Sequence, residues 1–183
     1  MVETSRLNKE DWLAAGFRAL AAEGPGALRA EPLARRLNTT KGSFYWHFKD
    51  VPDYKRQMLK LWREKVATEV IDAVEQTPGV AAQLQHLLAR AALPPPEQFG
   101  GRAIEPAVRA WALTDPDVKA ALSEVDAIRT AFVAKLLSEF GLTDPDLPQA
   151  IYAVYLGLDD LTAKGSGDIA TGLPALMKLV LRP

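Results

Sequence analysis

The densest group of side chains that could do chemistry lies around residue 45, where aromatic rings alternate with hydrogen-bond donors. Lys41, Gly42 and Ser43 come first, three aromatic rings follow at 44–46, and His47 comes next. Ammonium, hydroxyl and imidazole groups donate hydrogen bonds to phosphates and base edges. A glycine in so short a helix costs up to about 1 kcal/mol against alanine, and it permits close approach to a groove. The segment therefore predicts contact with nucleic acid.

The spacing of these residues divides them between two faces of a short helix. Thr39 or Thr40 is a suitable N-cap for a helix over residues 41–48. Phe44 and Phe48 lie one turn apart, so we expect both to face inward. Tyr45 and Trp46 cannot both share that face, so at least one is exposed. The alternative is that these aromatics are core residues and that His47 is an ordinary surface histidine.

Composition excludes several classes of chemistry. The 183 residues include no cysteine and only two histidines, His47 and His86, so disulfides, thiolate sites and paired-histidine metal sites are excluded. We find no nucleophile–base pair, phosphate-binding loop or cofactor motif, and predict a protein that is not an enzyme and uses no metal or cofactor. No apolar run approaches the ~18 residues of a membrane span. We expect a cytoplasmic protein without membrane contact.

Charge is distributed unevenly along the chain. Residues 1–60 carry 11 Lys and Arg against 7 Asp and Glu, whereas residues 61–183 carry 11 against 16. A basic head on an acidic body suits a nucleic-acid contact confined to the head, because phosphates attract the one and repel the other. Chance is an equally good explanation of the asymmetry taken alone.

Helical periodicity runs through the whole sequence, which predicts an all-α protein of about nine helices. The first begins at Asn8, with a capping box to Asp11, and ends at Gly24. Two short helices follow, around 33–37 and 41–48. A long fourth helix over about 51–76 has apolar residues at 59, 62, 66, 70 and 74. The others are expected at about 80–93, 103–114, 116–140, 146–163 and from 171 onwards.

The first three helices form a predicted helix-turn-helix unit, in which Leu33, Leu37, Phe44 and Phe48 pack on Leu13, Phe17 and Leu20. The stretch LARRLNTTKGSFYWHFKD, residues 33–50, resembles the DNA-binding signature of TetR-family transcriptional regulators. The match extends over about residues 8–60. Beyond it the layout alone agrees, with a weaker similarity at Val108–Ala112 followed by Thr114, Asp115 and Pro116.

The resemblance implies a DNA-binding domain over residues 1–51 and a helical ligand-binding and dimerisation domain over 52–183, linked by the helix at 51–76. It implies DNA contacts by the following residues: Arg29, Thr39, Thr40, Lys41, Gly42, Ser43, Tyr45, Trp46, His47 and Lys49. Two positions depart from the family pattern. Val51 stands where a lysine is usual, and Glu31 lies where phosphate would repel it.

The resemblance also implies a bacterial repressor that a small molecule releases from double-stranded operator DNA. Phe99, Arg109, Trp111 and Tyr155 are the predicted ligand-binding residues, although the spacing of Trp111 suits a core position better, and Arg109 suits a surface ion pair better than an anion site. The residues at 146–163 are apolar on two sides of a helix, and such a helix must bury both. A twofold partner could cover the second side, which would place two reading helices on a palindrome.

The predicted interface of this homodimer comprises Ile151, Tyr152, Tyr155, Leu156, Leu173, Met177 and Val180. The alternative is that other helices of the same chain cover both sides. A second function also stays open, that of a dimeric sensing or interaction protein with this fold that does not bind DNA.

Overall fold

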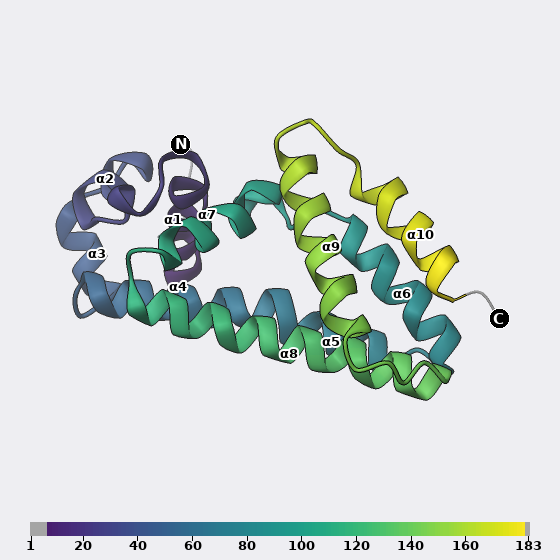
Figure 1. Ribbon diagram of the computed structural model, residues 1–183. Coiled ribbons are helices and arrows are strands. Elements are labelled where there is room, and N and C mark those ends of the chain that lie inside the picture. Colours follow the sequence, from purple (N-terminus) through teal and green to yellow (C-terminus); the bar gives the residue numbers. More distant parts are fainter. Residues whose placement is uncertain (1–6, 182–183) are drawn as a thin grey trace, which may run out of the picture. The chain divides into compact units, whose positions relative to one another are not determined.

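A computed structural model describes residues 7–181, and within them every regular element is helical. The α-helices are α1 (Lys9–Glu23), α2 (Ala30–Arg36), α3 (Lys41–His47), α4 (Val51–Arg63), α5 (Glu69–Glu75), α6 (Val80–Ala92), α7 (Ile104–Ala112), α8 (Pro116–Phe140), α9 (Leu147–Ala163) and α10 (Ile169–Val180) (Figure 1). A π-helical turn over Glu64–Thr68 joins α4 to α5, so these two form one continuous helix. The all-α prediction with about nine helices is confirmed.

Side-chain caps fix where α1 and α4 begin, and the cap of α1 is predicted from the sequence. Asn8 and Asp11 form a reciprocal capping box, with Asp11 N–H donating to Asn8 Oδ1 at 3.0 Å and Asn8 N–H to Asp11 Oδ2 at 2.8 Å. Asp50 accepts from the Asp53 N–H at 2.7 Å ahead of α4. Each cap satisfies donors that the first turn of a helix leaves without a partner.

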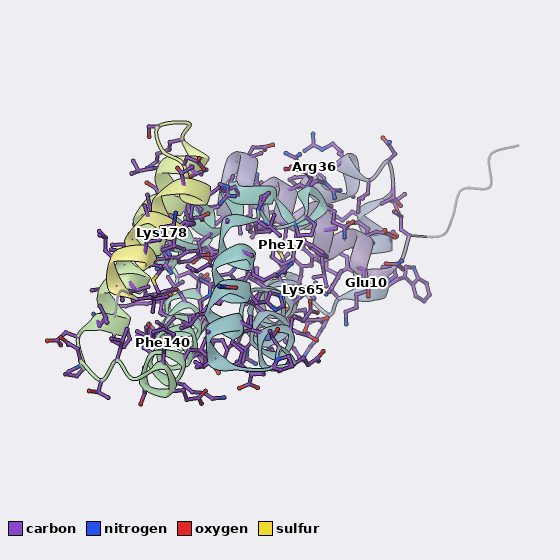
Figure 2. The ribbon with its side chains drawn as sticks, turned by 90° about the vertical axis from the view of Figure 1, so that its right-hand side faces the viewer. Glu10, Phe17, Arg36, Lys65, Phe140 and Lys178 are labelled. Carbon is purple, nitrogen blue, oxygen red and sulfur yellow. The ribbon has the colours of Figure 1, made fainter. Side chains whose placement is uncertain are left out.

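The chain folds into two compact units, and the first contains more than the predicted head. It comprises residues up to Trp62 together with Pro95–Val118. Phe99 packs edge-on against Phe17 of α1, with ring centres 5.8 Å apart, and the Arg18 guanidinium donates to the Gln98 carbonyl at 3.3 Å. Figure 2 shows Phe17 among other side chains and Arg36 at the surface. The three-helix head therefore shares its core with a segment that the predicted division at residue 51 assigns to the body.

The second unit comprises Arg63–Pro94 and the chain from Lys119 onwards. Its core joins residues of α5, α6, α8, α9 and α10: Val74, Leu84, Phe132, Leu136, Leu137, Ile151 and Met177. The Ile169 N–H at the start of α10 donates to the Thr162 hydroxyl of α9 at 2.9 Å, which ties these two helices together. No helix among residues 7–181 is both long enough and apolar enough to cross a membrane.

Candidate nucleic-acid interface

The turn between α2 and α3 has the backbone conformation that its sequence predicts. Asn38 adopts a positive φ of 51°, a conformation that asparagine tolerates better than most residues. Thr40 then caps α3, its hydroxyl accepting the Ser43 N–H at 3.3 Å. Asparagine and threonine therefore set the position at which α3 begins relative to α2.

One face of α3 is locked into the head by a cluster of aromatic rings. Phe44 and Phe48 are both buried, as predicted, and their ring centres lie 5.1 Å apart. Phe44 packs edge-on against Trp12 of α1 at 5.4 Å, and Phe48 against Tyr54 of α4 at 4.8 Å. Rings packed edge to face contribute about 0.5–1.5 kcal/mol per pair beyond their buried area. The cluster thereby holds α3 against two other helices.

Tyr54 adds a hydrogen bond to this cluster, and sequence reasoning did not identify it. Its hydroxyl donates to the Trp12 carbonyl at 2.8 Å across 42 residues of sequence. Burial raises the pKa of Tyr54, so the phenol keeps its proton and remains a donor. A Cβ on Gly16 would lie 1.8 Å from the Tyr54 hydroxyl, so the helices cross closely at this glycine. Tyr54 and Trp12 are far apart in the sequence, so no local sequence pattern indicates that they form a hydrogen bond.

The opposite face of α3 is open. Trp46 is 85% exposed and Tyr45 48% exposed, Lys41 and Gly42 are exposed, and His47 is half-buried. The predicted division of the helix into two faces is therefore confirmed, and both uncertain aromatics lie on the outside. A Cβ on Gly42 would meet only the Thr40 hydroxyl, at 3.6 Å. No contact among the described residues requires glycine there, and the missing side chain leaves room for close approach at this point of the surface.

A groove of about 320 Å³ lies between α2 and the outward face of α3. Its lining includes three cations together with Tyr45 and Val51, in the following set: Arg29, Ala30, Glu31, Pro32, Arg35, Lys41, Tyr45 and Val51. Glu31 lies 3.9 Å from Arg35 in an exposed ion pair, a weak interaction that partly offsets its charge. Val51 reaches the groove without supplying a donor. The concave surface therefore carries net positive charge of the kind that a phosphate backbone requires.

The connection from α3 to α4 holds Lys49 by its backbone. The Lys49 N–H donates to Asp53 Oδ2 at 3.1 Å, and the Gln57 amide donates to the same oxygen at 2.9 Å. Hydrogen bonds from Gln57 and from the Lys49 backbone lower the pKa of Asp53. The side chain of Lys49 is exposed, so the carboxylate fixes the main chain and leaves the ammonium group accessible.

The predicted ligand-binding residues are divided between the two units: Phe99, Arg109 and Trp111 belong to the first and Tyr155 to the second. Trp111 is buried, and its indole N–H donates to Asp115 Oδ2 at 3.1 Å. The other oxygen of Asp115 accepts the Asp117 N–H at 3.1 Å in the first turn of α8. Arg109 pairs with Glu105 at 2.9 Å. Trp111, Arg109 and the Phe17-packed Phe99 thus each have contacts within the first unit.

Four residues of the predicted dimer interface are covered by their own chain. Ile151, Tyr152, Leu173 and Met177 are buried within a single copy, and Ile151 and Met177 belong to the core of the second unit. Tyr155, Leu156 and Val180 are partly exposed. The large apolar side chains that α9 and α10 expose are Val154, Leu161 and Leu179, of which Leu179 is 61% exposed. Periodicity identified the buried side of these helices rather than the outward one.

Comparisons with known proteins agree with this arrangement. Residues 13–50 match the family model described as bacterial regulatory proteins, tetR family. No curated protein sequence matches. The fold is similar to that of a structure described as a TetR-family transcriptional regulator from Rhodococcus sp., with 19% identity, a TM-score of 0.74, and 95% of this chain and 98% of that chain covered.

Two further solved structures share the fold. One is a transcriptional regulator from Saccharomonospora viridis in complex with choline, with 13% identity, a TM-score of 0.78 and 94% of each chain covered. The other is the fatty acid degradation regulator FadR from Bacillus halodurans, with 15% identity, a TM-score of 0.69 and 97% of each chain covered. At such identities the likeness concerns the fold, whereas the family match rests on the residues of α1, α2 and α3.

Proposed function

We propose that the chain is a transcriptional regulator of the TetR family and that it binds double-stranded operator DNA as a homodimer through the outward face of α3. The observation that supports this most is the exposure of Trp46 and Tyr45 on a helix whose other side is fixed by buried rings. An exposed tryptophan beside Lys41 and a glycine suits a surface that is covered when the protein enters a major groove.

Residues of the interface take two kinds of role in this proposal. Lys41, Gly42 and Ser43 lie in the first turn of α3 and approach base edges, while Tyr45, Trp46, His47 and Lys49 contact phosphates or the groove edge. Thr39 and Thr40 contact the DNA backbone from the turn before α3, and Arg29 contacts it from the N-cap of α2. The groove lined by Arg29, Lys41 and Tyr45 supports this division, because it gathers donors around one concave surface.

The test is a binding titration of the full-length chain against duplexes from the region upstream of its own gene, repeated at several salt concentrations. Affinity should fall steeply as salt rises, because each neutralised phosphate releases counterions. Lys41→Ala should lower the preference for one duplex, and His47→Ala should weaken binding to all duplexes evenly. Lys60→Ala is the matched control, since Lys60 is exposed on α4 and does not line the groove.

A binding curve that is the same for every duplex, or no binding at low salt, would contradict the proposal. The absence of binding would favour the second function, a sensing or interaction protein of the same fold that does not bind DNA. The observations that support this alternative are Val51 and Glu31, which both line the groove.

We further propose that the protein is a repressor and that a small molecule releases it from a palindromic operator. Two proteins of similar fold suggest the first probes, since one was solved with choline and another is a fatty acid degradation regulator. An effector that moves the population from 99:1 to 1:99 must prefer the released form by about 5.5 kcal/mol. Choline and long-chain fatty acids should be titrated into the DNA complex; an effector lowers DNA affinity, whereas a compound that leaves it unchanged is not one.

A further inference from the structure

One turn of the continuous helix over residues 51–75 is wound differently from the rest. Between α4 and α5, the Glu69 N–H bonds to the Glu64 carbonyl, five residues back instead of four. Trp62 and Ala67 are both buried although they are five residues apart, a spacing that fits the wider π turn. The turn therefore accommodates one residue more than an α turn and changes which later side chains face inward.

Arg129 of α8 reaches the backbone of this turn. Its Nε donates to the Val66 carbonyl at 3.2 Å, and its Nη1 donates to the Tyr152 hydroxyl of α9 at 3.2 Å. That hydroxyl donates in turn to Asp126 Oδ1 at 2.7 Å. The guanidinium carbon also lies 5.9 Å from the centre of the Tyr155 ring, which is stacked on Tyr152. Contacts from α8 and α9 therefore fix the direction in which Arg129 points.

A second cation of α8 provides a contrast. Lys135 pairs with the Glu75 carboxylate of α5 at 2.6 Å, and both side chains are exposed. A flexible carboxylate can follow its partner when a helix shifts by a residue, whereas a backbone carbonyl cannot. Because Arg129 bonds to the backbone, its contact depends on the winding of the turn, and the contact of Lys135 does not.

We propose that Arg129 is a positioning residue that holds Glu64–Thr68 in its π-helical register. Without this contact, the turn exchanges with regular α-helix. A change of register by one residue corresponds to a rotation of about 100° and a rise of about 1.5 Å along the helix. Because α4 continues into the turn without a break, the change also acts on α4, whose Tyr54 ring packs against Phe44 of α3.

Hydrogen exchange of the full-length chain tests this role without DNA. In Arg129→Leu, the amides of residues 66–71 should exchange about tenfold faster than in the wild type, because the π turn has lost the bond that holds it. Lys135→Ala is the matched control on the same helix and should leave these amides unchanged. Equal exchange in Arg129→Leu and the wild type would overturn the proposal, as would equal acceleration in both variants.

A milder variant keeps the test decisive if the leucine variant does not fold. Arg129→Lys retains the charge and the aliphatic stem, but one ammonium group cannot reproduce the planar fork that serves two acceptors. Exchange of residues 66–71 should then lie between the wild type and the leucine variant. Wild-type exchange in a folded Arg129→Lys protein would overturn the proposal.

The effect on DNA binding rests on the function proposed above. With a duplex that the wild type binds, Arg129→Leu should lower affinity about threefold to tenfold, a coupling of ordinary size, while Lys135→Ala should not. Faster exchange with unchanged affinity would overturn the transmission to α4. If the wild type binds no duplex, the proposed function fails, and the exchange result still decides whether Arg129 holds the turn.

Discussion

The head and the second unit bury their helices by different means. In the head, buried aromatic rings fix one side of α3 and leave its polar groups on the other, so the helix has a defined inward and outward face. The second unit has a core shared by five helices in which Phe132 is the one aromatic side chain among the buried residues of the cluster. In the short α3, the ring cluster determines which side chains face outward. In the second unit, the core shows only which side of each helix is covered. The predictions below test this difference.

The largest effect is expected from removing a ring of the head cluster. Phe44→Ala should lower the free energy of unfolding by about 3–5 kcal/mol, the usual cost of truncating a buried phenylalanine, because Phe44 contacts Trp12, Phe48 and Tyr54. Denaturant unfolding measures the change. Trp46→Ala is the matched control two residues away: it should leave stability within about 0.5 kcal/mol and weaken DNA binding. A similar loss of stability in both variants would contradict the two-faced helix.

Two glycines of the head should respond to alanine with opposite signs. Gly16→Ala introduces a methyl group against the Tyr54 hydroxyl and should destabilise the protein by about 1–3 kcal/mol, as overpacking does. Gly42→Ala has space around it and should raise stability by up to about 1 kcal/mol through helix propensity, yet weaken DNA binding. Thermal unfolding of both variants measures the changes in stability, and duplex titration measures the changes in DNA affinity. Unchanged DNA affinity in Gly42→Ala would remove the reason inferred for that glycine.

The second unit provides a test of its outward apolar residues. Leu179→Glu places a charge on an exposed position of α10 and should weaken the proposed dimer by at least about tenfold, or 1.4 kcal/mol, without unfolding the monomer. Analytical ultracentrifugation over a range of concentrations measures this. Lys178→Glu, at the neighbouring exposed position, is the charge control. If both variants dimerise like the wild type, the interface lies away from this side of α10.

The smallest effect expected is the pH dependence of stability that Asp53 contributes. The pKa of Asp53 is lowered in the folded state, so its carboxylate stabilises the protein above the unfolded pKa of about 4, and this contribution is lost as the pH falls through the lower folded value. Asp53→Asn should therefore unfold more easily than the wild type at neutral pH, with the difference shrinking below about pH 4. Urea titrations at both pH values measure it. A difference that grows on acidification would contradict the assignment.

The sequence predicted the head in more detail than the second unit, and the reasons are physical. Asn8, Thr40 and Asp50 cap helices through neighbours three residues away, so their roles are visible locally. The contact of Tyr54 with Trp12 crosses 42 residues and is not visible in that way. The orientation of Phe44 and Phe48 followed from their spacing, whereas the groove between α2 and α3 required the tertiary structure.

In the second unit, periodicity showed which residues are covered but not what covers them. Periodicity predicts that Ile151 and Met177 contact a partner, whereas both are buried by their own chain. The π turn was also missed, although a trace of it lies in the sequence. The apolar residues at 59, 62, 66, 70 and 74 recur on average more slowly than the 3.6 residues of an α turn, and that excess is what a π turn absorbs.

The packing of Phe99 on Phe17 limits how the three-helix head can be fused to another protein. A fragment that ends after α3 or α4 would lack the Phe99 ring that packs on Phe17 of α1. It would also lack the Gln98 carbonyl that accepts from the Arg18 guanidinium. A folded chimera therefore needs both segments of the first unit, the residues up to Trp62 and Pro95–Val118. For the same reason, substitutions at positions 17 and 99 should compensate for one another in descendants of this chain.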